Sequence, residues 1–136
     1  MRLFGDITDG QVCRTLKLLR SAQPGLDRDW LPDAVLLAAE LIARRPAAAD
    51  RDVIFWLEGL LRHPDIAVRE HAIIALAVAK AVDAIPALRV IAEANANNSP
   101  GSYAFGAISY IEGRTSWSES RGIQSWDVWR DWGSPQ

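Results

Sequence analysis

Three neighbouring side chains that could do chemistry, Arg69, Glu70 and His71, stand at the polar start of an apolar run, in the stretch HPDIAVREHAIIALAVA. A metal site needs several ligands that converge, such as histidines four residues apart on a helix together with a carboxylate. The only other histidine is His63, eight residues earlier and on the other side of Pro64. This arrangement does not predict a metal site, and we expect no cofactor.

Nucleophilic catalysis finds no better support in the chain. Cys13 is the only cysteine and stands beside an apolar stripe, which is typical of a core thiol. The sequence contains no Gly-x-Ser-x-Gly motif, no glycine-rich phosphate loop and no Cys-x-x-Cys pair. We therefore predict no catalytic residue and no enzymatic activity. One cysteine cannot form an intrachain disulfide, which favours a reducing cytoplasm.

The charge balance argues against a phosphate backbone or an anionic membrane as the partner. The 136 residues carry a net charge of −2, and no run of basic residues exceeds the pair Arg44-Arg45. The N-terminal residues lack the apolar stretch of a signal peptide. The longest apolar run, residues 72–79, is too short to cross a bilayer. We expect a cytoplasmic protein that does not bind a membrane, and the charge balance does not favour a nucleic acid as its partner.

The elements that carry these side chains have helical spacing. Pro64 is expected in the first turn of a helix, and Asp65 near the positive end of its dipole. Ile73 and Ala77 are apolar on a second face, so the helix should be sandwiched between neighbours. Its first apolar face has the spacing i, i+4, i+7, i+8 and i+11, at Val68, Ala72, Ala75, Leu76 and Ala79.

This helix belongs to a unit that recurs along the chain. A second helix follows after a turn of about three residues, with Asp83 as the expected N-cap and Pro86 in its first turn, so the two should form an antiparallel hairpin. A Pro-Asp pair at Pro32 lies 32 residues before Pro64, and Pro100 lies 36 residues after it. A period in the thirties built from helical hairpins predicts an all-α solenoid.

Further helices fit the same scheme. The stretch TDGQVCRTLKLLRSA, residues 8–22, has a helical stripe and should cap the stack at its N-terminal end. Asp50 is the expected N-cap of a helix that buries Val53 and Leu57.

The best-preserved unit resembles a HEAT repeat of the short bacterial HEAT-like kind, also known from PBS-lyase-type proteins. Residues 31–62 and 99–113 match more loosely, because both lack the Val-Arg pair. The family pattern falls on Pro64-Asp65, Val68-Arg69, Ala72, Ala75-Leu76, Asp83 and Ala84-Ile85-Pro86-Ala87-Leu88. The resemblance implies a short right-handed α-solenoid (an alpha-alpha superhelix) whose first helices form a convex face and whose second helices form a concave face. It also implies that Arg69 bridges to an aspartate, and that the protein binds a macromolecule rather than doing chemistry.

We therefore expect a single domain over residues 1–136. Residues 1–30 would form the N-terminal capping helix, residues 31–113 about two and a half repeats, and residues 114–136 a tryptophan-rich C-terminal cap. The ending SRGIQSWDVWRDW also resembles the C-terminus of some bacterial HEAT-like proteins.

Two groups of residues are candidates for binding a partner. Trp and Arg are frequent in interface hot spots, so the C-terminal group is either a buried cap or an exposed hot spot. Its members are Trp126, Trp129, Arg130 and Trp132. The second group should lie on the concave face, as a groove or as an ordinary solvated surface. Its members are Trp56, Glu58, Arg89 and Glu93.

The function we predict is a non-catalytic interaction module, or scaffold, that binds a protein through the concave face or the aromatic end. One alternative is an immunity protein that neutralises a bacterial toxin. Others are an accessory to bilin attachment and a helical-repeat DNA binder.

Overall fold

Every regular element that the structure describes is a helix. The computed structural model describes residues 8–22, 30–94 and 101–113, except the side chains of residues 9, 101 and 102. The α-helices in these ranges are α1 (Asp9–Ala22), α2 (Leu31–Arg44), α3 (Arg51–Leu60), α4 (Ile66–Val78), α5 (Ile85–Ala94) and α6 (Gly101–Ile111). Short 3-10 helices, η2 (Pro46–Ala48) and η3 (Val82–Ala84), precede α3 and α5. The all-α prediction is confirmed, and none of the described helices is both long and apolar enough to cross a membrane.

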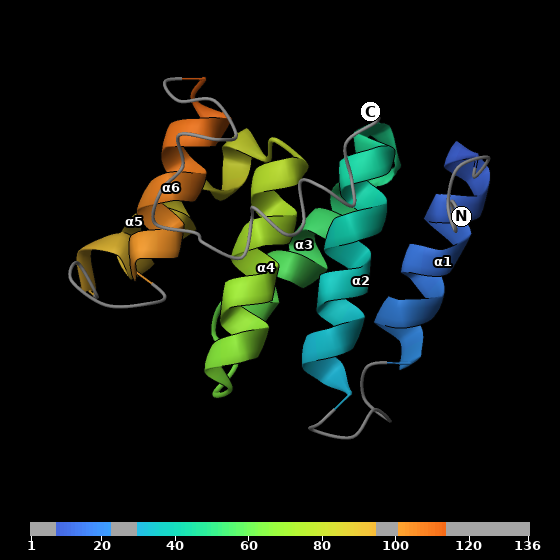
Figure 1. Cartoon of the computed structure of the whole chain (residues 1–136), viewed down its shortest axis with the longest axis horizontal. Helices are drawn as coiled ribbons and strands as arrows, with labels where there is room; N and C mark the ends of the chain where they lie inside the picture. The colour runs from blue at the N-terminus through green and yellow to red at the C-terminus, as the bar shows by residue number, and fades with distance from the viewer. Residues whose placement is uncertain (1–7, 23–29, 95–100, 114–136) are drawn as a thin grey trace, which may run out of the picture.

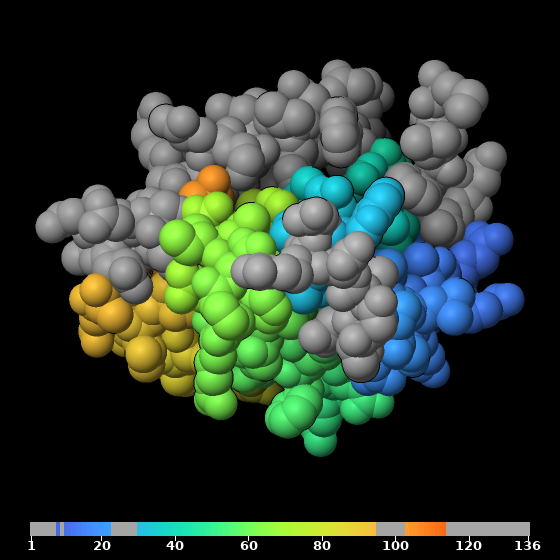
Figure 2. All heavy atoms as spheres, turned by 90° about the horizontal axis from the view of Figure 1, so that it is seen from below, coloured from blue at the N-terminus to red at the C-terminus, as the bar shows by residue number. Residues whose placement is uncertain are grey.

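The helices lie in two layers. In Figure 1, α2, α4 and α6 stand side by side and run in the same direction, while α3 and α5 lie behind them. We call α2, α4 and α6 the first layer, and α3 and α5 the second layer. The view from below places α3 (green) and α5 (gold) along the same long side of the molecule (Figure 2). The helix α1 stands beside α2 and also contacts α3.

The layers are joined by contacts between neighbouring units. Along the first layer α2 packs against α4 and α4 against α6, and between the layers α3 packs against α4 and α5 against α6. The predicted hairpin partners α4 and α5 have less close backbone contact with each other than with these neighbours.

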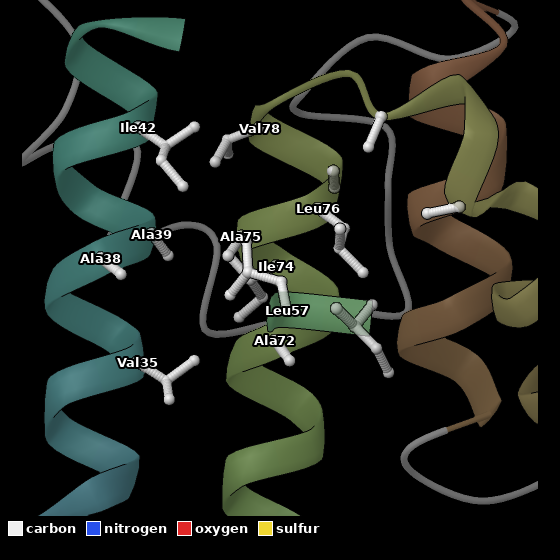
Figure 3. Close-up of a cluster of buried hydrophobic side chains, with 14 of the residues drawn as sticks. Val35, Ala38, Ala39, Ile42, Leu57, Ala72, Ile74, Ala75, Leu76 and Val78 are labelled. Carbon is white, nitrogen blue, oxygen red and sulfur yellow. The ribbon is translucent and has the colours of Figure 1, made fainter. Parts of the chain in front are cut away.

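Small and branched aliphatic side chains together form the contact between α2 and α4. In Figure 3, Val35, Ala39 and Ile42 of α2 point toward α4, and Ala75 and Val78 of α4 point toward α2. Ala72 lies beside Leu57, on the side of the second layer. Every residue from Ala72 to Val78 is buried, so the prediction that α4 is sandwiched is confirmed.

Polar caps set the first residue of three helices. At α1, Gln11 N donates to Thr8 Oγ1 at 3.2 Å while Thr8 N donates to Gln11 Oε1 at 2.8 Å, which is a capping box. At α3, Asp50 Oδ1 accepts from Val53 N at 3.0 Å, as predicted. At α4, Asp65 Oδ1 accepts from Ala67 N at 2.8 Å.

Two of the predicted helix starts are wrong. Because Asp65 has extended backbone angles and is itself the N-cap, α4 begins at Ile66 and Pro64 lies before the helix rather than in its first turn. Asp83 is not an N-cap, since it lies inside η3, which begins after Ala81. That extra 3-10 turn places Pro86 in the first turn of α5, as expected.

The end of α4 is a Schellman turn with a lysine where glycine is usual. Ala81 N donates to Leu76 O at 3.1 Å and Lys80 N to Ala77 O at 2.9 Å, while Lys80 has a positive φ of 54°. The Lys80 side chain reaches α6, where Nζ donates to Tyr110 O at 3.2 Å and lies 4.2 Å from the centre of the Tyr110 ring. This contact joins the turn after α4 to the end of α6.

Candidate functional site

The second layer exposes apolar side chains on the side away from the core. In α3, Val53 and Leu57 are buried, whereas Phe55 between them is 79% exposed. In α5, Leu88 is buried and Val90 is 68% exposed. Residues two apart on a helix point about 200° apart, so each exposed residue lies opposite its buried neighbours. We call this exposed side of α3 and α5, centred on Phe55 and Val90, the second-layer surface.

Half-buried apolar residues continue this surface toward the core. Ile54 of α3 and Ala87 and Ile91 of α5 pack against the core while keeping part of their area accessible. Each of the two helices therefore carries both exposed and half-buried apolar side chains outside the core. Among the described residues Phe55 and Val90 have the two largest exposed fractions of any large hydrophobic side chain.

The charges that border this surface are of both signs and are weakly paired. Asp52 Oδ2 lies 3.8 Å from Arg20 Nη1 of α1, and Arg89 Nη2 lies 3.8 Å from Glu112 Oε2 beyond α6. Ion pairs at this length and exposure contribute at most about 1 kcal/mol. The two ion pairs instead show how the helices are oriented. The edge of α3 that carries Asp52 faces α1, and the edge of α5 that carries Arg89 faces the end of α6.

Helical spacing distributes the four second-layer residues predicted to form one groove over different edges of α3 and α5. Trp56 is half-buried, and it stands four residues after Asp52, so it lies on the edge of α3 that faces α1. Glu58 is two residues further and lies on the opposite edge. Arg89 and Glu93 share the edge of α5 toward α6. Phe55 and Val90, which centre the surface, were not among the predicted residues.

The second predicted group, at the C-terminal end, cannot be placed. Trp126, Trp129, Arg130 and Trp132 lie outside the described residues.

His71 in the polar stretch before the apolar run makes a structural hydrogen bond. Its Nδ1 lies 2.7 Å from Pro32 O of α2. Since a carbonyl oxygen can only accept, Nδ1 carries the proton. His63 has the opposite arrangement, because its Nδ1 accepts from Asp65 N at 3.1 Å. The Nδ1 atom is therefore a hydrogen-bond donor in His71 and an acceptor in His63.

The charged neighbours of His71 are partly withdrawn from solvent. Burial raises the pKa of the Glu70 carboxyl, and His71 and Arg69 oppose this rise. Arg69 Nε is buried without a hydrogen-bond partner, and no ion pair of Arg69 with an aspartate occurs among the residues described. The bridge implied by the HEAT resemblance is therefore not seen there. Within the described ranges no three His, Cys, Asp or Glu side chains are grouped as metal ligands.

Cys13 also has a structural environment. It is half-buried beside the core, and its Sγ donates to Ala48 O of η2 at 3.5 Å. This contact ties α1 to the turn before α3.

Comparison of the chain with protein-family models, with curated proteins and with solved structures gave no match.

Proposed function

We propose that the protein is a non-catalytic interaction module, a short right-handed HEAT-like solenoid that binds a protein partner through its second-layer surface. The layered order of the helices supports the solenoid part of the proposal: α2, α4 and α6 run in the same direction on one side and α3 and α5 lie on the other. In a solenoid of this kind the second layer forms the concave binding face.

The observation that carries the binding proposal is the exposure of Phe55. Burying a phenylalanine side chain is worth roughly 1.5–3 kcal/mol, so leaving 79% of it in water forgoes most of that gain. Aromatic residues are enriched in the cores of protein interfaces. The mixed charges around Phe55 suit a protein partner better than a nucleic acid, which would need a basic surface.

Matched substitutions test this proposal. Phe55→Ala removes the centre of the second-layer surface, while Phe105→Ala removes a 47% exposed phenylalanine from α6 of the first layer. Each variant and the unchanged protein would be immobilised and exposed to lysate of the source organism, and the retained proteins compared by quantitative mass spectrometry.

A specific partner should be retained by the unchanged protein and by Phe105→Ala, and its recovery should fall at least tenfold with Phe55→Ala. A loss of about 1.4 kcal/mol corresponds to this factor, which is modest for an aromatic hot spot. Equal recovery of every retained protein by all three forms would contradict the role of the second-layer surface.

The compartment follows from the same proposal. We place the protein in the cytoplasm, because its one thiol cannot form an intrachain disulfide and no disulfide framework is available to it.

A further inference from the structure

One side of α4 is buried in a way that its described neighbours do not explain. The residues Ile66, Glu70, Ile73 and Ala77 have the spacing i, i+4, i+7 and i+11, so they share one side of the helix. Exposure falls along this stripe: Ile66 is 51% exposed, Glu70 is half-buried, and Ile73 and Ala77 have no exposed surface. We call these four residues the outer stripe of α4.

The described helices cover the other sides of α4. His71 contacts Pro32 on α2, and Val78 points toward α2 as well (Figure 3). Leu76 points to the opposite side, where α6 lies, and Leu57 of α3 lies on the side of the second layer. The outer stripe faces away from α3, and in Figure 1 none of the described helices lies in front of α4. Ile73 and Ala77 are nevertheless fully buried, although no described helix lies over this side of α4.

The sequence outside the described ranges offers one segment with enough apolar surface. Residues 23–29 and 95–100 are short connections held at both ends, and residues 1–7 precede α1, whose main contacts are with α2, η2 and α3. Residues 114–136 are longer, contain four tryptophans, and follow directly on α6, which packs against α4. A tryptophan-rich segment that follows a helix packed against α4 is the matching cover for an apolar stripe.

We propose that the segment 114–136 packs over the outer stripe of α4, with its tryptophans against Ile73 and Ala77. The tryptophans are then an internal partner of the first layer and not the surface that captures another protein. This inference does not depend on the proposed function, because it concerns the opposite layer of the molecule. Withdrawal of Glu70 from water, which raises its pKa, agrees with such a cover.

Site-specific photocrosslinking in the full chain tests the proposal. The amino acid p-benzoylphenylalanine would replace Glu70 in one protein and Phe55 in a matched control, and crosslinked peptides would be mapped after trypsin digestion. Cleavage after Arg114, Arg121 and Arg130 divides the segment into three peptides, residues 115–121, 122–130 and 131–136.

Position 70 should crosslink within one chain to at least one of these three peptides, and position 55 to none of them. Crosslinks from position 70 only to other regions, or equal crosslinking of the segment from position 55, would overturn the proposal. The size of the crosslinked product separates contacts within a chain from contacts between two copies.

A second measurement covers the case in which the crosslinker disturbs α4. In the full chain, Trp126→Ser, Trp129→Ser and Trp132→Ser together should lower the urea midpoint of unfolding, because they remove the apolar cover. Tryptophans that project into solvent would leave the midpoint unchanged, and this result would refute the inference. Phe55→Ala should reduce partner recovery without altering the crosslink, so the two proposals fail separately.

Discussion

The hydrogen bond from His71 to Pro32 O allows a quantitative prediction of how substitutions at His71 change the free energy of unfolding, because only one ring nitrogen takes part in the bond. The Nδ1 to O distance is 2.7 Å, and the bond is partly buried between α4 and α2. Asparagine places its amide nitrogen close to the position of histidine Nδ1, whereas glutamine places it nearer to Nε2. His71→Asn should therefore keep the donor, and His71→Gln and His71→Ala should lose it.

The size of the effect follows from the bond and its setting. A typical intramolecular hydrogen bond contributes a net of about 0.5–1.5 kcal/mol to the free energy of unfolding. The loss in His71→Ala should be near the upper end, at roughly 1.5 kcal/mol, because the half-buried ring also removes packing. In a chain of 136 residues this corresponds to a fall of about 3–8 °C in Tm.

Urea unfolding followed by far-UV circular dichroism measures these differences. The stability order should be wild type, then His71→Asn, then His71→Gln and His71→Ala. Equal stability of His71→Gln and His71→Asn, or of His71→Ala and the wild type, would refute a stabilising role of the Nδ1 hydrogen bond. A nitrogen-15 NMR spectrum should show the proton on Nδ1 of His71 at neutral pH.

Three further predictions concern α4 and its packing. Asp65→Ala removes the N-cap and should lower the free energy of unfolding by about 1 kcal/mol, while Asp65→Asn keeps an acceptor and should lose less, as measured by urea unfolding. Ala75→Leu overfills the contact between α2 and α4 and should cost about 1–3 kcal/mol, whereas Ala47→Leu at an exposed position of η2 should change stability little in a thermal melt. Burial raises the pKa of Glu70, so the folded state binds its proton more tightly than the unfolded state does. Stability from this group is then present at low pH and is lost as the pH rises from the ordinary value of 4.5 through the raised pKa, and Glu70→Gln should remove that part of the pH dependence of the urea midpoint.

The sequence was most informative where local spacing alone decides the structure. The apolar positions on two faces of α4 predicted a sandwiched helix, and seven consecutive buried residues agree with this. Asp50 was correctly predicted as the N-cap of α3 because its side chain needs only the backbone three residues on. The start of α4 was predicted wrongly, since a proline fits both the first turn and the position before an N-cap, and only the backbone angles of Asp65 decide between them.

The candidate surface could not be predicted in the same way. The stretch Val-Ile-Phe-Trp-Leu, residues 53–57, has five consecutive hydrophobic residues, so its periodicity does not say which of them faces the core. Contacts of α3 with α4 and α1 set the rotation of the helix and leave Phe55 outside and Trp56 half inside. The sequence shows that this stretch is hydrophobic, but it does not show which of its side chains point away from the core.

The burial of α4 on all its sides has a consequence for how this protein tolerates change. A substitution at Ala72, Ala75, Leu76 or Val78 disturbs the packing of α2, α3 or α6 against α4, so few side chains should be acceptable at these positions. The helices α3 and α5 each pack against the core with one side only. Substitutions at the exposed Phe55 or Val90 should therefore leave these helices in place. Sequence variants of this protein could therefore acquire new recognition properties by altering the second layer while the central helix stays constant.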